Sequence, residues 1–412
     1  MKNKLKTPAA LILILCLAAL TGAGCVKPAP EPDAPTAAPT FSPAPPLTFA
    51  PTPEPTPEPT QEPEKYAAVR AALEGMTYRE KIGQLVMFGF WGRDGVEPGF
   101  AALMEKYPVG NIILSSGNID KDDGSGGFDS ARRIVDEIKE AYPCAVPRLF
   151  SADVEGGGVT RFRFEPALPS AYEQGKMEPD EVRELFEGVG SRLVSCGINM
   201  DLAPVFDISE DPLSSFLGDR IISSELGTVC AIGGAVIDGL HRGGCIACAK
   251  HFPGHGGTAE DSHTGTPVIN RNAAELYDRD IAAFGSAIEA GVDCIMAAHV
   301  IYPAFDEGDT ASMSHIILTG LLRGELRFRG VIMTDDMLMA GLSSMYSPGE
   351  AALKFILAGG DMLLCSSDTA VQEEILLALY RAYETRIITD ERLDESVSRI
   401  LALKYDYGVW RP

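Results

Sequence analysis

Eight short apolar runs alternate with longer amphipathic stretches along residues 65–412, and this alternation constrains the fold more than any other feature. Apolar runs of this length, bounded by polar residues, are typical of buried strands. Eight strands joined by helical crossovers predict an α/β fold, a single (β/α)8 barrel with extra helices at its C-terminal end. An open, doubly wound sheet is the alternative. The predicted strands are Leu85–Phe88, Asn111–Leu114, Arg148–Ala152, Asn199–Leu202, Ile246–Lys250, Cys294–Ala298, Gly330–Thr334 and Met362–Cys365.

The stretches between these runs predict the helices that would cover such a barrel. Apolar residues recur in them at helical spacing, as expected for elements with one buried face. A barrel of this type takes up about 250 residues or more, so we expect residues 65–412 to form one domain. Predicted helices include Asp180–Ser195, Asn272–Ala290 and His315–Leu326, and two more near Val371–Tyr383 and Asp390–Tyr405 close the chain.

Polar side chains follow five consecutive predicted strands at the point where each strand ends. The carboxyl ends of the strands in a parallel barrel share one rim, and the chemistry of such folds takes place there. We therefore expect these side chains to surround one site. They are Asp153, Asp207, Lys250 with His251, His299 and Asp335.

The segment Lys250–Pro267, KHFPGHGGTAEDSHTGTP, is a glycine-rich polar loop that carries a candidate proton-transfer pair. Asp261 lies two residues before His263, and a carboxylate so placed can accept the ring N–H and support the imidazolium form. An imidazole with a pKa near about 6.5 can donate and recover a proton near neutrality. Two alternatives remain open: a solvated loop in which these groups never meet, and a metal site. Its ligands would be His251, His255, His263 and Asp261, but the loop lacks the i, i+4 helical pairing common in zinc enzymes.

Asp335 follows the seventh predicted strand, in the segment VIMTDDM. A carboxylate at the rim of a strand is held rigidly, which suits a nucleophile that attacks an anomeric carbon. The alternative is helix capping, a common role of Asp after a strand. Because two aspartates stand together, we expect Asp336 to cap the next helix and Asp335 to point into the barrel mouth.

The segment DVEGGGVTR, Asp153–Arg161, follows the third predicted strand. Asp153 and Arg161 can bind sugar hydroxyls, and we expect Gly156–Gly158 to let the backbone approach a bound sugar. A tight turn with a simple ion pair is the alternative. A substrate-assisted glycosidase that uses Asp153 and Glu155 as its acidic pair is another, but it leaves the loop after Lys250 without a role.

The first 64 residues differ in composition from the rest. Lys2, Lys4 and Lys6 precede the apolar run Pro8–Leu20, which is too short to span a bilayer comfortably. Small residues then lead to Cys25, so residues 1–25 resemble a bacterial lipoprotein signal with Cys25 as the lipidated residue; an ordinary secretory signal is the alternative. Residues 26–64 are rich in Pro, Thr, Ala and Glu and predict a disordered linker with polyproline II character.

Charge and cysteine content exclude several classes of partner and cofactor. The formal net charge of −23 argues against nucleic acid and against loose adhesion to anionic lipid. Of the nine cysteines, seven follow residue 25 and most lie in apolar runs, as buried small side chains do. Cys245 and Cys248 form a CxxC pair, but residues three apart on a strand face opposite sides. We therefore expect neither a disulfide framework nor a redox or zinc role.

Several of these segments together resemble glycoside hydrolase family 3, in its β-N-acetylglucosaminidase (β-N-acetylhexosaminidase) branch. The resemblance runs from about Met76 to Tyr407, with the motifs in the order of the family. It implies a TIM-type barrel and a retaining, two-step mechanism that releases terminal β-linked N-acetylglucosamine. The motifs are MTYREKIGQLVM, DVEGGGVTR, NMDLAPVFDI, KHFPGHGGTAEDSH and GVIMTDDM.

The resemblance also implies a role for individual residues. Asp335 matches the covalent nucleophile, His263 the acid/base and Asp261 its orienting partner. Residues that match sugar-binding positions are Asp153, Arg161, Arg220, Lys250 and His251. The chain departs from the common pattern at Gly158, where many members have Arg, and at Gly257, where many have Asp. Both changes are expected to reshape the leaving-group side or the loop.

We therefore expect a monomeric, lipid-anchored bacterial surface enzyme that takes terminal N-acetylglucosamine from peptidoglycan fragments or chitin oligomers, with no cofactor and no metal. A family 3 β-glucosidase is one alternative; such proteins usually carry a second domain with a carboxylate acid/base, and we expect none here. A sugar-binding lipoprotein without turnover is the other. A neutral imidazole repels anions less than a carboxylate does, so we also hypothesise that phosphate competes with water and yields sugar 1-phosphate.

Overall fold

The computed structural model describes residues 64–258 and 265–411. The chain divides into two units, Met1–Thr60 and Gln61–Pro412, and all the described residues belong to the second. Within it, eight parallel strands close into a barrel in the order β1-β12-β11-β8-β7-β6-β3-β2. The predicted (β/α)8 barrel is thus confirmed, and the open-sheet alternative is wrong. The barrel strands are β1 (Val86–Phe88), β2 (Asn111–Ile113), β3 (Leu149–Ala152), β6 (Met200–Asp201), β7 (Ile246–Phe252), β8 (Cys294–Ala297), β11 (Val331–Asp336) and β12 (Met362–Cys365).

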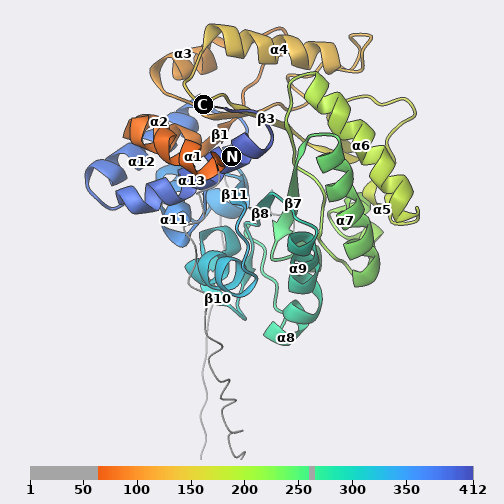
Figure 1. The fold of residues 1–412 in the computed structure, drawn as a ribbon. Coiled ribbons are helices and arrows are strands. Elements are labelled where there is room, and N and C mark those ends of the chain that lie inside the picture. Colours follow the sequence, from red (N-terminus) through yellow and green to blue (C-terminus); the bar gives the residue numbers. More distant parts are fainter. Residues whose placement is uncertain (1–63, 259–264, 412) are drawn as a thin grey trace, which may run out of the picture. The chain divides into compact units, whose positions relative to one another are not determined.

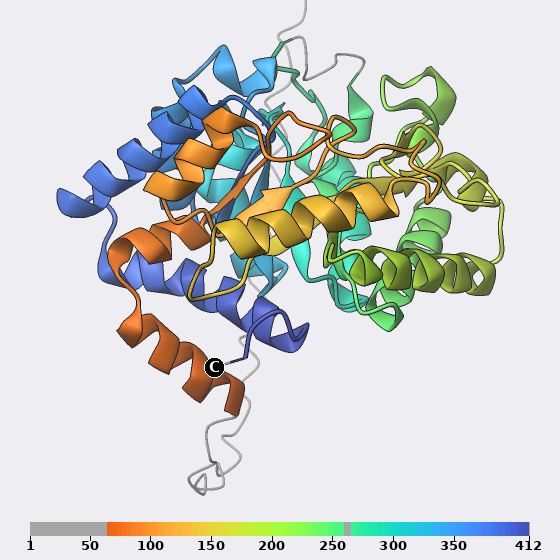
Figure 2. The same ribbon diagram turned by 90° about the horizontal axis from the view of Figure 1, so that it is seen from above.

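Helices surround these strands (Figure 1), and Figure 2 shows the same fold turned by 90° about the horizontal axis. Neighbouring helices pack in pairs, such as α6 on α7 and α11 on α12, and α1 packs on α13. The longer ones are α1 (Glu64–Gly75), α2 (Tyr78–Gln84), α3 (Pro98–Lys106), α4 (Phe128–Ala141), α6 (Pro179–Ser195), α7 (Leu226–Arg242), α9 (Ala282–Glu289), α11 (Pro348–Ala358), α12 (Thr369–Glu384) and α13 (Asp390–Asp406). Shorter ones are α5 (Ala171–Gln174), α8 (Ala273–Glu275) and α10 (Ala340–Ser343), and η4 (Leu276–Ile281) and η6 (Ile316–Glu325) are π-helical.

Local signals in the sequence explain where several helices begin. Thr77 caps α2, and Ser347 caps α11; each forms a capping box with the glutamate three residues later. Pro348 occupies the first turn of α11, where its missing N–H costs no hydrogen bond. At the other end of α11, Gly359 adopts a left-handed conformation (φ 106°), which ends the helix and turns the chain into β12.

Two antiparallel hairpins follow barrel strands: β4 (Val154–Gly156) with β5 (Val159–Thr160), and β9 (Ile301–Tyr302) with β10 (Asp306–Thr310). The first corrects the expected role of Gly156–Gly158. A Cβ atom on Gly156 would lie 2.0 Å from the carbonyl oxygen of Pro169, and one on Gly157 would lie 2.7 Å from Cβ of Ser170. These two glycines therefore let the hairpin pack on its own chain, not on a sugar. Only Gly158 faces open space.

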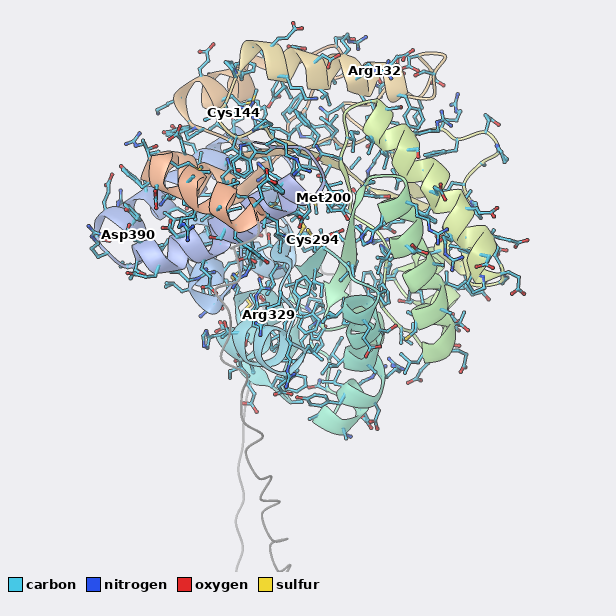
Figure 3. All side chains as sticks on the ribbon, viewed as in Figure 1. Arg132, Cys144, Met200, Cys294, Arg329 and Asp390 are labelled. Carbon is cyan, nitrogen blue, oxygen red and sulfur yellow. The ribbon has the colours of Figure 1, made fainter. Side chains whose placement is uncertain are left out.

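Most side chains of the core are apolar, and the described thiols are free. In Figure 3, Met200 and Cys294 lie among the strands, whereas Arg132 and Asp390 lie on peripheral helices. The seven cysteines of the described chain form no disulfide, and five are buried, as expected of core residues. Within residues 64–258 and 265–411, no helix combines the length and the apolar character needed to cross a bilayer.

Candidate active site

A cavity of about 440 Å³ opens at the carboxyl ends of the barrel strands. Its volume lies within the range of small-ligand pockets, about 300–1,000 Å³. Every barrel strand, or the residues just after it, contributes to the wall, as expected for the rim of such a fold. The lining residues are Trp91, Ile113, Ser115, Ser116, Asp153, Val159, Arg161, Leu202, Arg220, Lys250, His251, Met296, Asp335, Asp336, Met339, Leu364 and Ser366.

A larger hollow of about 750 Å³ lies between α11 and α12. Its wall consists of apolar side chains with exposed glutamates and an arginine, and it includes no histidine and no aspartate. The strand-end cavity, by contrast, holds the predicted nucleophile and all five predicted sugar-binding residues. It is therefore the candidate active site.

Irregular pairing at the ends of two strands turns adjacent side chains into this cavity. Between β7 and β8, Lys250 pairs with Met296 and Phe252 with Ala297, so His251 is the extra residue of a bulge. This explains why Lys250 and His251, which would alternate on a regular strand, both line the cavity. A second irregularity lies between Met333 and Asp336 where β11 pairs with β12.

Asp335 stands at the end of β11 with its side chain largely buried. Its Oδ1 atom accepts the N–H of Asp336 at 2.8 Å, and its Oδ2 atom lies 3.9 Å from Nε2 of His251. Burial raises the pKa of the Asp335 carboxyl, but the interaction with His251, the hydrogen bond from the N–H of Asp336 and the charge of Lys250 together lower it more, and the net pKa lies below its usual value. Asp335 is thus held as a carboxylate, the form a nucleophile needs.

Asp207, in the segment after β6, fixes the orientation of His251. Its Oδ2 atom lies 2.6 Å from Nδ1 of the imidazole, and its Oδ1 atom accepts the N–H of His251 at 3.2 Å and that of His255 at 2.6 Å. Burial raises the pKa of Asp207, and the charge interaction with His251 lowers it to a net value below normal. Because a carboxylate only accepts hydrogen bonds, Nδ1 of His251 carries the proton and Nε2 points towards Asp335.

A cluster of five charged side chains lies at another part of the cavity, and all of them except Glu155 line its wall. Nζ of Lys250 lies 2.9 Å from Oδ1 of Asp153 and 2.6 Å from Oε1 of Glu155. Arg161 binds Asp153 at 2.8 Å, and Arg220 makes two bonds to Glu155, at 2.8 and 2.9 Å. The ion pair considered for Asp153 and Arg161 therefore exists, within a larger network.

This charged cluster stays ionised because each charge faces its opposite. Burial raises the pKa of Asp153 and Glu155, but Lys250 and the arginines outweigh it, so both carboxyls titrate below their usual range. Burial lowers the pKa of Lys250, but Asp153 and Glu155 raise it more, so the net pKa lies above normal. Burial also lowers the pKa of Arg220, and the charge of Glu155 raises it above its normal value. Three cations and two anions leave the cluster with an excess positive charge beside Asp335.

Hydrogen bonds of His299 and Asp336 hold the end of β11 against neighbouring segments. Nε2 of His299 lies 3.2 Å from the carbonyl oxygen of Asp336, and Nδ1 lies 2.7 Å from the hydroxyl of Ser312. Burial lowers the pKa of His299, which keeps the ring neutral. Asp336 accepts hydrogen bonds from Leu338 N–H and from the N–H and hydroxyl of Ser366. The expected helix cap at Asp336 is therefore wrong: it ties β11 to the end of β12, and the N-cap of α10 is Met339.

Two of the predicted catalytic residues cannot be placed. Asp261 and His263 lie outside the described residues, as do Cys25 and the linker up to residue 63. The metal set of His251, His255, His263 and Asp261 is untested for the same reason; within residues 64–258 and 265–411 no group of three or more His, Cys, Asp or Glu side chains is arranged to hold a metal. The base of the loop is described: Gly257 lies against Arg271, where an added Cβ atom would approach Nη1 to 2.8 Å.

Sequence reasoning missed part of this site. Glu155 was considered only as half of an acidic pair, and its binding to Lys250 and Arg220 becomes visible only once the β4–β5 hairpin has formed. Trp91, Ser115 and Ser116 were not predicted. The one sequence feature that indicates these three residues is their position, since they follow the first two strands as Asp153 follows the third.

The chain matches the Glycosyl hydrolase family 3 N terminal domain over residues 77–403. It is 30% identical over 334 residues to a protein named beta-hexosaminidase A from Pseudoalteromonas piscicida, covering 74% of this chain and 55% of that one. A beta-hexosaminidase from Idiomarina loihiensis is 34% identical over 256 residues, covering 60% and 76%. A solved family 3 beta-N-acetylglucosaminidase from Paenibacillus sp. str. FPU-7 superposes with a TM-score of 0.77 at 35% identity, covering 81% of this chain and 63% of that one.

The chain thus spans just over half of the Pseudoalteromonas protein and under two thirds of the Paenibacillus one. The family match itself covers the whole barrel, from the start of α2 into α13, and includes every residue that lines the cavity. This chain belongs to glycosyl hydrolase family 3.

Proposed function

We propose that this protein is a retaining exo-β-N-acetylglucosaminidase that releases terminal N-acetylglucosamine through a covalent glycosyl-enzyme. One observation carries the proposal: the ionised Asp335 carboxylate faces a strand-end cavity whose wall includes a network of charged hydrogen-bonding groups. Such a cavity suits a ligand that is uncharged at its reacting carbon and rich in hydroxyls. The similarity to proteins named beta-hexosaminidase and beta-N-acetylglucosaminidase supports the choice of sugar.

In the first step Asp335 attacks the anomeric carbon and the bond to the leaving oxygen breaks. His263, oriented by Asp261, protonates that oxygen; in the second step it takes a proton from water, which attacks the same carbon and frees Asp335. Lys250, Arg161 and Asp153 bind the hydroxyls of the sugar, and Arg220 acts with them while holding Glu155. His251 binds through Nε2, which Asp207 directs into the cavity.

The charge state of the cluster disfavours the substrate-assisted alternative. That mechanism needs a protonated carboxylic acid beside the leaving group. Asp153 and Glu155 both have a lowered pKa, and both are bound by cations. Neither fits the role of proton donor near neutral pH.

Paired substrates test the proposal against its two rivals. We expect hydrolysis of an aryl β-N-acetylglucosaminide to exceed that of the matching β-glucoside, and Asp335→Ala to abolish it. A β-glucosidase would show the opposite preference, and a binding lipoprotein would bind sugars without releasing the aryl group. Product analysis on a defined muropeptide and on a chitin oligomer would then show which of these two substrate classes the enzyme prefers.

Phosphate as an acceptor is a further part of the proposal. If phosphate replaces water in the second step, the product is N-acetylglucosamine 1-phosphate and no free sugar forms in that turnover. The measurement is product analysis on the same muropeptide with and without high phosphate. Turnover without any sugar phosphate would contradict it.

We also propose that the protein acts as a monomer on the outer face of the cytoplasmic membrane of a bacterium, anchored through a lipid on Cys25. The support is the charged, apolar and small-residue order of residues 1–25 and the long Pro-rich segment after them. Cys25→Ser should move the protein from the membrane fraction to the medium or soluble fraction. Membrane retention of this variant would contradict lipid anchoring, and sedimentation of the released protein would measure its oligomeric state.

A further inference from the structure

Trp91 leaves most of a large aromatic ring in solvent at the rim of the active-site cavity. Its exposed fraction is 60%, although it lines the same cavity as Asp335. The only other tryptophan of the chain, Trp410, is 6% exposed. An exposed indole lacks the stabilisation that burial of its apolar surface would give, so a contribution to the stability of the fold does not explain its position.

The backbone on both sides of Trp91 is held in place. The buried side chain of Asn118 donates from Nδ2 to the carbonyl oxygen of Phe90 at 3.0 Å and to that of Gly92 at 3.1 Å. Its Oδ1 atom accepts the N–H of Ser115 at 2.9 Å, so Asn118 is held within the segment after β2 while its Nδ2 atom joins that segment to the one after β1. Phe90 itself is buried and stacks on Phe100, with ring centroids 4.9 Å apart. The backbone that carries the exposed ring is therefore held in place by hydrogen bonds and packing.

The ring is also supported along one edge. A Cβ atom added at Gly117 would lie 2.5 Å from Cε3 and 2.7 Å from Cζ3 of Trp91, so glycine is needed there for the indole to settle on the loop. Ser115 and Ser116 line the cavity beside it, and the hydroxyl of Ser115 is oriented by Oδ1 of Asn118 and the N–H of Gly117, each at 3.2 Å. A flat apolar face next to hydroxyls matches a pyranose ring, which has one apolar C–H face and polar edges.

We infer that Trp91 is the binding platform for the second sugar ring, the one that leaves with the glycosidic oxygen; this rests on the proposed function. The terminal sugar needs the charged groups, and these lie deep: the side chains of Lys250 and Asp153 are 3% and 15% exposed. Trp91 and its serines form the outer wall of the same cavity. They thus determine specificity for substrates whose leaving group is itself a pyranose.

Two substrates that differ only in the leaving group test this role. N-acetyl-β-glucosaminyl fluoride has no second ring, whereas chitobiose has one. Trp91→Ala should lower the ratio of kcat/KM for chitobiose to that for the fluoride by about threefold to tenfold, and Trp91→Phe should restore most of it. Gly117→Ala should lower the same ratio, because the new methyl group displaces the indole without removing it. An unchanged ratio in Trp91→Ala would overturn the inference, whether both kcat/KM values stay the same or both fall by the same factor.

Fluorescence gives a readout that does not depend on turnover. In Trp410→Phe, Trp91 is the sole tryptophan of the chain. With Asp335→Asn added to prevent hydrolysis, chitobiose should change the tryptophan emission more than N-acetylglucosamine does. Calorimetry on the same protein shows whether chitobiose is bound. Binding without any change in emission would place the second ring elsewhere.

Failure of the inference and failure of the proposed function give different results. If the wild-type protein hydrolyses neither substrate, the proposed function fails. If it hydrolyses both and the Trp91 variants keep the wild-type ratio, the function stands and the platform is wrong.

Discussion

Nε2 of His251 lies 3.9 Å from the carboxylate of Asp335, and Asp207 holds the opposite ring nitrogen at 2.6 Å. The two aspartates thus bracket one imidazole, and they stand on different strand ends. Asp207 has no direct contact with the cavity, so its effect on the reaction passes through His251. This makes it a positioning residue.

Asp207→Asn tests this relationship. A neutral amide in place of the carboxylate removes the charged acceptor that holds the proton on Nδ1 and orients the imidazole towards Asp335. We expect kcat/KM to fall on the order of 10- to 100-fold, as for a mispaired buried polar group, and ¹⁵N NMR to show a changed signal for Nδ1 of His251. Asp293→Asn is the matched control, because Asp293 binds His241 at 2.8 Å outside the cavity. Equal losses in both variants would contradict the positioning role.

Lys250 separates two buried acids, and its loss should destabilise the fold. Lys250→Met leaves Asp153 and Glu155 facing each other without their shared cation, so the free energy of unfolding should fall by about 3–5 kcal/mol. Lys176→Met breaks an exposed pair with Glu173 and should cost at most about 1 kcal/mol. Urea denaturation of the two variants measures the difference. Similar denaturation midpoints in the two variants would mean that the buried network adds little to the free energy of unfolding.

The pKa shifts predict how activity responds to pH. Asp153, Glu155 and Asp335 have lowered pKa values, so their charges, and the stability these charges add, persist above the usual carboxyl pKa and are lost only as pH falls below it. The raised pKa of Lys250 preserves its charge up to and beyond its usual 10.5. With a glycosyl fluoride, which needs little proton donation, kcat/KM should stay flat from about pH 5 to about pH 8. Burial raises the pKa of the neighbouring Asp336, so the control is Asp336→Asn; an acidic limb near pH 6 that persists in this variant would contradict an ionised Asp335.

His263→Ala tests the proton donor. Aryl glycosides with good leaving groups need little protonation, so they should lose less activity than a natural disaccharide does. The ratio of kcat/KM values for the two substrates, in wild type and variant, is the measurement. Equal loss on both would remove His263 from the acid role.

The barrel was predictable because most residues of its strands are apolar and buried, and each predicted strand matches the structure to within two residues at either end. The strand-end rule also brought Asp153, Lys250, His251 and Asp335 into one cavity. Alternation along a strand does not predict that Lys250 and His251 share a face, since this depends on the bulge against β8.

Other features depended on contacts between segments far apart in the chain. The pairing of Glu155 with Arg220 joins residues 65 positions apart, and no local pattern indicates it. Asp336 was predicted to cap a helix, but the hydroxyl and N–H of Ser366 on the neighbouring strand end compete for its carboxylate. The position of Trp91 depends in the same way on Asn118 and Gly117, which belong to the next βα segment.

The central claim is that Asp335 forms a covalent bond to the sugar. A 5-fluoro analogue of N-acetylglucosaminyl fluoride should form the glycosyl-enzyme quickly and release it slowly, so the adduct accumulates. Mass spectrometry of tryptic peptides should then locate one added sugar on Gly330–Lys354, at Asp335 and not at Asp336. An adduct on Asp336 or Asp153, or steady turnover with no adduct at all, would contradict the claim.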